Sequence, residues 1–307
     1  MTLRIGLPGG GATVDRLIDN AVKAEAEGFA TLWFPGGGGL DPLVLLPLVG
    51  RATSTIGLGT SVLPTYPRHP VLMAQQASTV AMAIGDGSRL TLGVGVSHRP
   101  VIEGVYGLSY DTNARHLREY LTVLRTMFQD GRVRFRGDEY TAVAELAPRP
   151  DQPVEVLVAA LAPRSLAAAG ELAAGTITWM ANAHAVETLI APTLRQAATA
   201  AGRPEPRIVV GLPVAVTDDE DASREAAARQ FSVYGTLPNY QRVLAAGGVS
   251  SPAEAAIVGT EDQVGKAIVD LVAAGATDVW AAPFPVGDDR SASRQRTRAL
   301  LRDLVAG

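Results

Sequence analysis

Strand-like and helix-like runs alternate eight times along the chain, and this alternation limits the possible folds more than any other feature. The strand-like runs are short and almost continuously apolar, as parallel strands are when helices cover their outer face. The helix-like runs place apolar residues at helical spacing, as in residues 13–27, which stop at Gly28. Eight repeats without a linker predict one α/β domain over residues 1–307, a closed (β/α)8 TIM barrel rather than an open doubly wound sheet.

Two segments interrupt this alternation. Residues 132–146 read as two short strands around the turn signal Gly137-Asp138, so we expect an inserted surface hairpin before the fifth unit. We also expect a helical excursion near residues 234–252, after the seventh strand. The eight expected barrel strands are residues 3–8, 30–34, 56–63, 90–96, 154–160, 176–180, 208–216 and 279–284.

Composition narrows the possible functions. The formal net charge is −4 and the basic residues are scattered, so the basic patch of a nucleic-acid-binding protein is not expected. No apolar run approaches the ~20 residues that span a bilayer, and the N-terminus lacks a signal-peptide core, so we expect a cytoplasmic protein. The absence of cysteine excludes disulfides, thiolate nucleophiles and cysteine-ligated metals.

Glycines recur at alternate positions in the third and fourth strands. They are Gly57 and Gly59 in one strand, and Gly93 and Gly95 in the other. Small residues of this kind fit the crowded inside of a barrel, but they also let a ligand approach the backbone closely. Because both strands open into polar loops that contain histidine, we favour a flat cofactor lying across the strand ends.

The carboxyl ends of the strands, where barrel enzymes hold their active sites, lack several kinds of chemistry. Both lysines, Lys23 and Lys266, fall in helical runs, so no Schiff-base nucleophile is available. Asp218 and Asp219 precede a helix and are interpreted as helix caps rather than as a pair of catalytic carboxylates. No metal-ligand spacing is present, so we expect no metal site. An apolar mouth with hydroxyls and a few arginines favours a bound cofactor that supplies the chemistry.

Each remaining polar candidate has a structural alternative. His98 follows the fourth strand and is the better functional candidate, whereas His69 could equally complete a helix cap. His116 and His184 are interpreted as surface or packing residues, and Trp179 as a packing residue. Residues 162–165 start a helix, whose free N–H groups and dipole could bind a phosphate without a basic side chain.

Four stretches, in the correct order, resemble the bacterial-luciferase-like flavin and deazaflavin oxidoreductases, which are TIM barrels. The Ser-His-Arg-Pro continuation after strand four and the Trp-Met-Ala end of strand six are most similar to the actinobacterial branch that uses coenzyme F420. The stretches are Gly57-Leu-Gly-Thr-Ser-Val with Arg68-His69-Pro70; Arg89-Leu-Thr-Leu-Gly-Val-Gly-Val-Ser-His98; Gly170-Glu-Leu-Ala-Ala-Gly-Thr-Ile-Thr-Trp179; and Val258-Gly-Thr-Glu-Asp-Gln-Val264, leading to Ala274-Gly-Ala-Thr-Asp278.

The resemblance implies where the cofactor lies. Its ring would cover the ends of strands three and four, supported by a non-proline cis peptide at Ser61–Val62. Its phosphate would lie at Ala159-Ala160 and the helix start that follows them, and Arg68, Arg99 or Arg164 would meet its lactyl phosphate and glutamate tail. The residues expected to bind the cofactor are Gly36, Gly37, Ser61, Val62, Arg68, Val96, Ser97, Arg99, Ala159, Ala160, Pro163 and Arg164.

The chain also departs from the family. Many members carry an acidic residue and a histidine after strand two, where this chain has Pro35 followed by four glycines, so no acid or base role is expected there. His98 stands where some deazaflavin relatives have an acidic proton donor, which makes it the candidate catalytic residue. We expect the glycine run, residues 106–110 and residues 234–240 to line the substrate pocket.

Three hypotheses follow from the resemblance. The first is an F420-dependent oxidoreductase, chiefly a reductase, that moves hydride between the deazaflavin C5 and a small organic substrate. The second is an FMN-dependent monooxygenase supplied with reduced cofactor by a separate reductase. The third is a non-catalytic flavin-binding barrel, because the fold does not by itself imply activity. Relatives commonly form homodimers, so a homodimer is expected as well.

Overall fold

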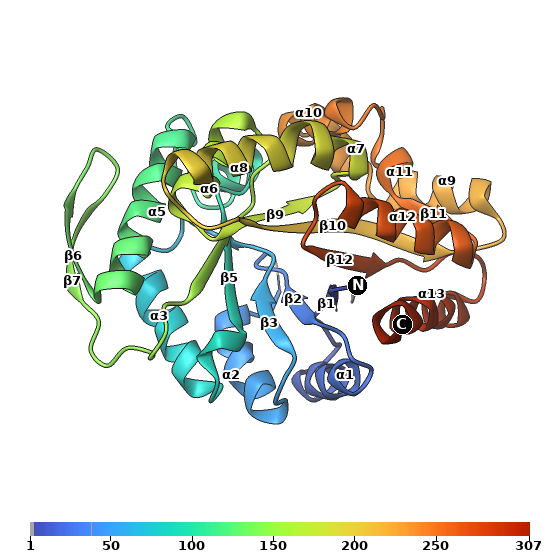
Figure 1. Ribbon diagram of the computed structural model, residues 1–307, viewed down its shortest axis with the longest axis horizontal. Helices are drawn as coiled ribbons and strands as arrows, with labels where there is room; N and C mark the ends of the chain where they lie inside the picture. Colours follow the sequence, from blue (N-terminus) through green and yellow to red (C-terminus); the bar gives the residue numbers. More distant parts are fainter. Residues whose placement is uncertain (1–2, 38) are drawn as a thin grey trace.

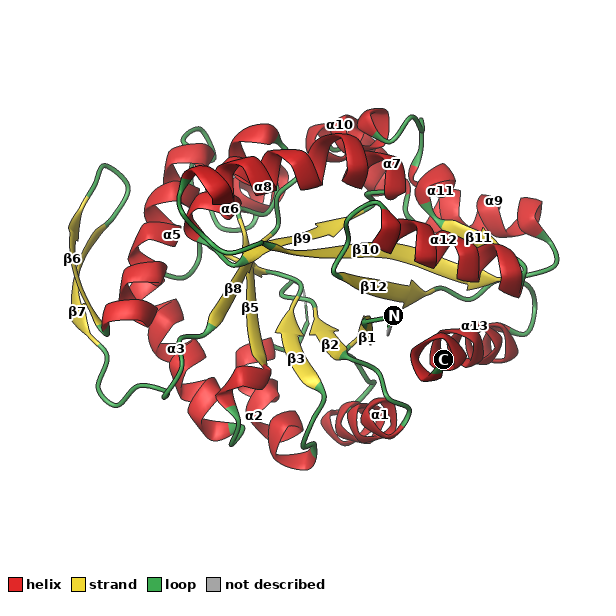
Figure 2. Ribbon diagram, in the orientation of Figure 1, coloured by secondary structure: helices red, strands yellow, loops and turns green. Residues whose placement is uncertain are grey.

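The computed structural model describes residues 3–37 and 39–307 and shows parallel strands that close into a ring with helices on the outside (Figures 1 and 2). Going around the ring, β1 pairs with β2, then β3, β5, β8, β9, β10 and β12 follow, and β12 pairs again with β1. The eight ring strands are β1 Ile5–Pro8, β2 Thr31–Phe34, β3 Gly57–Thr60, β5 Leu90–Gly95, β8 Glu155–Val158, β9 Gly175–Trp179, β10 Arg207–Val216 and β12 Asp278–Pro283. The predicted TIM barrel is therefore confirmed.

Helices cover the outer face of this ring. Asp41 caps α2 by accepting a hydrogen bond from the Leu43 amide, and Pro42 occupies the first turn. The main helices are α1 Val14–Ala26, α2 Pro42–Ala52, α3 Pro70–Ala83, α5 Asn113–Asp130, α6 Pro163–Leu172, α8 Ala191–Ala200, α12 Glu261–Ala273 and α13 Arg290–Ala306. The segment before α8 forms α7 Ala183–Ala185 and the π-helical turn η2 Val186–Ile190.

Smaller elements were only partly predicted. The hairpin of β6 Arg132–Arg136 and β7 Thr141–Glu145 is confirmed, and Figure 1 shows it extending away from the barrel beside α5. The excursion after β10 resolves into α9 Glu220–Gln230, η3 Ser232–Thr236, α10 Pro238–Ala246, α11 Pro252–Ala255 and the short strand β11 Ile257–Gly259. The third expected strand is split into β3 and β4 Leu63–Pro64, and the fourth is preceded by η1 Gly87–Arg89 and followed by α4 Arg99–Gly104.

The inside of the barrel holds its own apolar cluster, separate from the layer between strands and helices. Trp33, Leu157, Ile177 and Val209 are buried together and come from four different strands. Charged residues close the barrel at the opposite end from the carboxyl ends. Arg207, Asp278 and Glu155 are the first residues of β10, β12 and β8.

The Arg207 guanidinium donates hydrogen bonds to both carboxylates, to Asp278 Oδ1 at 2.7 Å and to Glu155 Oε2 at 2.6 Å. Its Cζ lies 5.7 Å from the centre of the Trp33 ring, so the same side chain caps the interior cluster. The ion pairs of Arg207 thus join the amino ends of the strands. The carboxyl ends remain available for a binding site.

Candidate active site at the carboxyl ends of the strands

A cavity of about 350 Å³ opens at the carboxyl ends of the barrel strands. Its walls come from segments that follow β2, β3, β5 and β8, from the ends of β9 and the middle of β12, and from the excursion after β10. The lining residues are Pro35, Ser61, Val62, Val96, Ser97, His98, Ala159, Ala160, Leu161, Ser165, Ile177, Thr178, Trp179, Tyr234, Asn239, Tyr240 and Trp280. Barrel enzymes hold their active sites at this end.

The structure brings about half of the sequence-predicted site residues together in this cavity. Ser61, Val62, Val96, Ser97, His98, Ala159 and Ala160 all line it. Gly36, Gly37, Arg68, Arg99, Pro163 and Arg164 do not contribute to its walls. Gly38, which belongs to the same glycine run, lies outside the described residues.

The end of β3 is held close to β5 beneath the cavity. Thr60 Oγ1 donates to the Gly93 carbonyl at 2.7 Å and accepts from the Gly93 amide at 2.8 Å. The peptide bond between Ser61 and Val62 is cis, as the family resemblance implies. A Cβ atom on Gly36 would collide with the Val62 carbonyl oxygen, so this glycine lets the segment after β2 pack on the backbone just after the cis peptide. Gly36 thus supports the cavity floor from behind.

Ser97 has a left-handed backbone conformation, with φ of 59°. Residues other than glycine rarely adopt this conformation, and it concentrates at functional sites. The Tyr110 hydroxyl donates a 2.9 Å hydrogen bond to the Ser97 carbonyl, which fixes the turn that follows β5. This turn carries His98 into the cavity wall.

His98 is the titratable residue at this turn. Burial lowers the pKa of its imidazole below the ordinary value, so the ring is neutral at pH 7. Its ring centre lies 5.7 Å from that of Tyr240, and it precedes α4 without capping that helix through its side chain. A neutral imidazole in a cavity wall can accept a proton from a hydroxyl group or, once protonated, donate one.

Two of the three arginines expected to meet a cofactor tail have carboxylate partners within the chain. Arg68 is ion-paired with Asp41, the capping residue of α2. Arg99 is paired with Glu103 and with Asp111, the latter at 3.0 Å. The Arg99 guanidinium also lies 5.5 Å from the centre of the Tyr110 ring. Arg99 therefore supports the Ser97 turn from outside.

The alternating glycines have a packing role, which confirms the first of the two interpretations that the sequence left open. A Cβ atom on Gly95 would lie 2.9 Å from the Ala159 Cβ, and one on Gly57 would lie 2.9 Å from Thr31 Oγ1. At Gly59 the Trp33 ring fills the place of the missing side chain, and at Gly93 the Thr60 carbonyl does. These glycines make room for neighbouring strands and for the interior tryptophan.

Four aromatic side chains form one wall of the cavity. The ring centres of Trp179 and Trp280 lie 5.0 Å apart, and those of Tyr234 and Tyr240 lie 4.8 Å apart. Trp179 and Tyr234, whose centres are 6.0 Å apart, join the two pairs.

The prediction that residues 234–240 line the pocket is confirmed for Tyr234, Asn239 and Tyr240, whereas Tyr110 supports the site from behind. Trp179 both packs and lines the cavity. Trp280 was missed, since an apolar strand gives no signal for it.

The other histidines and the aspartate pair have structural roles. His69 Nδ1 accepts from the Val71 amide at 3.2 Å and so caps α3. His116 is buried, with its Nε2 atom 2.8 Å from Thr65 Oγ1. Asp219 caps α9, as predicted, and Asp218 pairs with Arg296 on α13.

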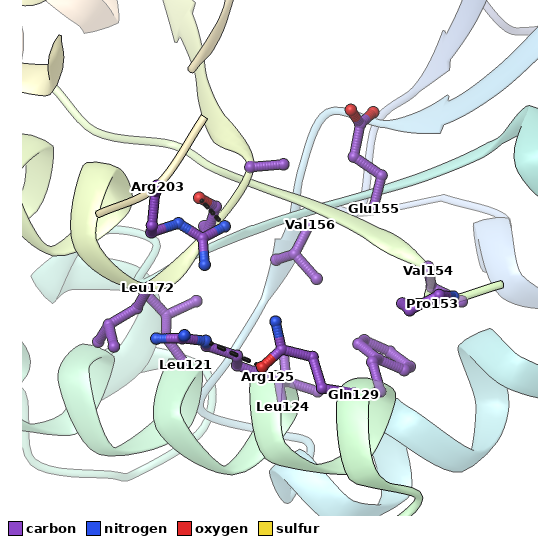
Figure 3. Close-up of a pocket in the computed structure, with 13 residues that line it drawn as sticks. Leu121, Leu124, Arg125, Gln129, Pro153, Val154, Glu155, Val156, Leu172 and Arg203 are labelled. Carbon is purple, nitrogen blue, oxygen red and sulfur yellow. Dashed lines mark hydrogen bonds between the residues drawn. The ribbon is translucent and has the colours of Figure 1, made fainter. Parts of the chain in front are cut away.

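A second cavity, of about 190 Å³, lies outside the barrel between α5, α6 and the start of β8 (Figure 3). Its walls are mostly apolar, and two guanidinium groups reach into it. Arg125 donates to Gln129 Oε1 at 3.1 Å, and Arg203 donates to the Ala173 carbonyl at 2.9 Å. Because Glu155, the first residue of β8, belongs to its wall, this cavity lies toward the amino ends of the strands. It therefore lies toward the opposite end of the barrel from the one at which barrel enzymes hold their active sites.

Within residues 3–37 and 39–307, no group of three or more His, Asp or Glu side chains is arranged to hold a metal ion. Within the same part of the chain, no helix is both long and apolar enough to cross a membrane.

The sequence is similar to those of several known proteins. The chain is 31% identical over 229 residues to an F420-dependent glucose-6-phosphate dehydrogenase of Kineococcus radiotolerans, covering 70% of this chain and 68% of that protein. It is 30% identical over 292 residues to an F420-dependent hydroxymycolic acid dehydrogenase of Mycobacterium tuberculosis, covering 88% of this chain and 78% of the relative.

A solved structure of an F420-dependent secondary alcohol dehydrogenase in complex with an F420-acetone adduct superposes with a TM-score of 0.79 at 19% identity, covering 99% of both chains. At that identity the likeness supports the barrel fold alone. The family model described as luciferase-like monooxygenase matches residues 2–278. The chain therefore belongs to the luciferase-like monooxygenase family.

Proposed function

We propose that this protein is an F420-dependent oxidoreductase that transfers hydride between the deazaflavin and a small organic substrate. The observation that carries the proposal is the cavity at the carboxyl ends of the strands, where Ser61, Val62, Val96, Ser97 and His98 converge. The names of two relatives, both F420-dependent dehydrogenases, support the choice of cofactor. When bound, the deazaflavin supplies a carbon, C5, that accepts or gives up hydride.

The residues present fit a bound ring with polar edges. Ser61 Oγ is buried beside the cavity and has no hydrogen-bond partner within the described chain, so a polar group of the ring would satisfy it. The side chains of Val62 and Val96 add an apolar surface to the cavity wall.

A phosphate fits at the start of α6. Ala159, Ala160 and Ser165 line the cavity next to this helix start, and Pro163 occupies the first helical position, which needs no N–H donor. The free N–H groups of the first turn and the helix dipole attract an anion there. Arg164, exposed in the same turn, is our candidate for a tail carboxylate.

His98 is the proposed proton acceptor and donor. As a neutral imidazole it takes the hydroxyl proton when an alcohol is oxidised, and as an imidazolium it returns that proton when a carbonyl is reduced. Replacing His98 by Gln should lower turnover by about 10²–10⁴-fold, the usual contribution of a positioned acid or base. The dissociation constant for F420 should stay within about twofold. A loss of F420 binding equal to the loss of turnover would contradict this role.

Equilibrium binding tests the cofactor assignment. We expect oxidised F420 to bind the purified protein with micromolar affinity, measured by quenching of its fluorescence, and FMN to bind more weakly. A Ser61→Ala variant, which removes the hydroxyl and adds no volume, should bind F420 more weakly than the wild type. Tight FMN binding without F420 binding would refute the proposal.

One observation favours an FMN-dependent monooxygenase as a second candidate. Arg68 and Arg99 are paired with carboxylates and are not free to form a basic groove for a glutamate tail. FMN needs only the phosphate site at α6. In that case a separate reductase would supply reduced FMN, and oxygen uptake would depend on adding both the reductase and a substrate. The absence of oxygen uptake under those conditions would exclude this candidate.

We also propose that the protein is a homodimer, as the family resemblance of the sequence implies. Val44 and Leu48 on α2 are 69% and 49% exposed and lie one helical turn apart, next to the exposed Leu40. An apolar face of this kind is suited to burial against a second copy. That the enzyme works in the cytoplasm stays a prediction.

A further inference from the structure

Two cations in the wall of the second cavity have no anionic partner within the described chain. Arg125 comes from α5 and Arg203 from the segment before β10, and both line the cavity (Figure 3). Their hydrogen bonds go to uncharged acceptors instead. Arg125 donates to the Gln129 amide oxygen at 3.1 Å, and Arg203 donates to the Ala173 carbonyl at 2.9 Å. The cavity therefore carries positive charge that the protein itself leaves unbalanced.

The two cations also act on each other. Burial lowers the pKa of Arg203, and the charge of Arg125 lowers it further. Both side chains are half-buried, so water screens their repulsion less than at an open surface. The Glu155 carboxylate belongs to the same wall, but it is paired with Arg207 at 2.6 Å, and Figure 3 shows it pointing away from both guanidinium groups. A bound anion would supply the missing negative charge.

Most of the remaining wall is apolar. Its large apolar side chains come from α5, from the end of α6 and from β8 with the residue before it; they are Leu121, Leu124, Phe128, Val154, Val156 and Leu172. An apolar cavity of about 150 Å³ is large enough to bind benzene. The cavity here measures about 190 Å³, which leaves room for a ring or a short alkyl chain beside an anionic group. A small inorganic anion would leave this apolar surface uncovered.

We propose that the second cavity is a binding site for a small monocarboxylate with an apolar body. The carboxylate binds between Arg125 and Arg203, since the planar N–H donors of a guanidinium group match the two oxygens of a carboxylate. The apolar body packs on Phe128 and the surrounding leucines. The two cavities share no lining residue, so this site is separate from the one proposed for the cofactor.

Isothermal titration calorimetry of the purified protein tests the site with three probes. Benzoate carries both the carboxylate and an apolar body, benzyl alcohol has the body without the charge, and inorganic phosphate has the charge without the body. We expect benzoate to bind with a dissociation constant below about 1 mM, and each of the other two probes to bind at least about tenfold more weakly.

A Gln129→Glu variant tests the role of charge without changing the shape of the wall. Its carboxylate takes the place of the amide oxygen beside Arg125 and supplies the anion from within the chain. Because Gln129 is exposed and lies one helical turn from Arg125 on α5, the variant should fold normally. Benzoate should bind at least about tenfold more weakly to it.

Arginine variants complete the test. Arg203→Met should weaken benzoate binding at least about tenfold as well, because it removes one of the two cations. Arg134→Met is the matched control, since it removes an exposed cation of the hairpin that lies outside the cavity wall, and it should bind benzoate as the wild type does.

The inference is overturned if benzoate does not bind, or if benzyl alcohol or inorganic phosphate binds as tightly as benzoate. It is also overturned if both Gln129→Glu and Arg203→Met leave the affinity for benzoate unchanged. That last result would place benzoate elsewhere in the molecule. Binding in the cavity at the carboxyl ends of the strands would then be visible in the fluorescence of Trp179 and Trp280, which line that cavity.

Discussion

The buried imidazole of His116 predicts a specific loss of stability in mild acid. Its side chain is 4% exposed, it stacks on the Tyr66 ring with centres 3.7 Å apart, and it contacts the hydroxyls of Thr65 and Tyr140. Burial lowers the pKa of His116 to about 4, against 6.5 as its ordinary value. Between pH 4 and pH 6.5, His116 therefore binds a proton in the unfolded chain but not in the folded chain.

Proton linkage gives the direction and the size of this change in the free energy of unfolding. Because the folded-state pKa is depressed, the contribution of His116 is fully present above pH 6.5 and is lost as the pH falls toward 4. With these two pKa values, the free energy of unfolding should fall by about 2 kcal/mol between pH 7 and pH 5 through this residue alone. Since Thr65 follows β4 beside the cis peptide, this loss weakens the floor of the active site.

A His116→Phe variant isolates this contribution, because it keeps a stacking ring that does not titrate. Urea unfolding of both proteins at pH 7, 6 and 5 gives their difference in stability, from which the contributions of all other groups cancel. The variant should be less stable at pH 7, and the difference should narrow by about 2 kcal/mol at pH 5. A His184→Gln variant, changed at an exposed histidine, should follow the wild type. A difference between wild type and H116F that stays constant over this range would refute the reasoning.

Three further predictions concern stability and assembly. Arg207→Met should lower the free energy of unfolding by up to about 3 kcal/mol in urea titrations, because it removes the buried partner of Asp278 and leaves only the exposed Arg4 paired with it, and adding Asp278→Asn should recover part of the loss. Ser97→Gly should raise the same free energy by about 1 kcal/mol, since glycine adopts the left-handed conformation without strain, and an equal gain in Ser97→Ala would contradict this explanation. Val44→Asp should convert the proposed dimer to a monomer in light scattering, and an unchanged mass would place the dimer contact elsewhere.

The barrel could be predicted because each of its strands and helices is specified by residues that are close together in the sequence. Apolar runs, helix caps such as Asp41 and breaks such as Gly28 each specify one element, and eight repeats leave few alternatives to closure. The strand ends followed from the same reasoning, since the carboxyl ends of parallel barrel strands meet at one face, and Ser61, Ser97 and Ala159 were therefore expected together.

The partners of side chains could not be predicted in the same way. The sequence does not indicate that Arg68 and Arg99 would find carboxylates, because Asp41 lies on another element and pairing depends on the folded geometry. The sequence left two interpretations of the glycines of β3 and β5 open for a similar reason, since the Trp33 ring that fills the space at Gly59 comes from a different strand. Trp280 was missed because nothing in its neighbours along the chain marks a cavity wall.

The excursion between β10 and β12 has a consequence for how new activities could arise in this barrel. Tyr234, Asn239 and Tyr240 reach the cavity from this segment, while the residues proposed to hold the cofactor come from other units of the ring. The segment is anchored by a 2.9 Å hydrogen bond from Asn182 to the Gly247 carbonyl. The residues expected to recognise the substrate and those proposed to hold the cofactor thus come from different segments of the chain. Mutation or recombination within the segment could diversify one while leaving the other intact, which makes it the natural target for directed evolution.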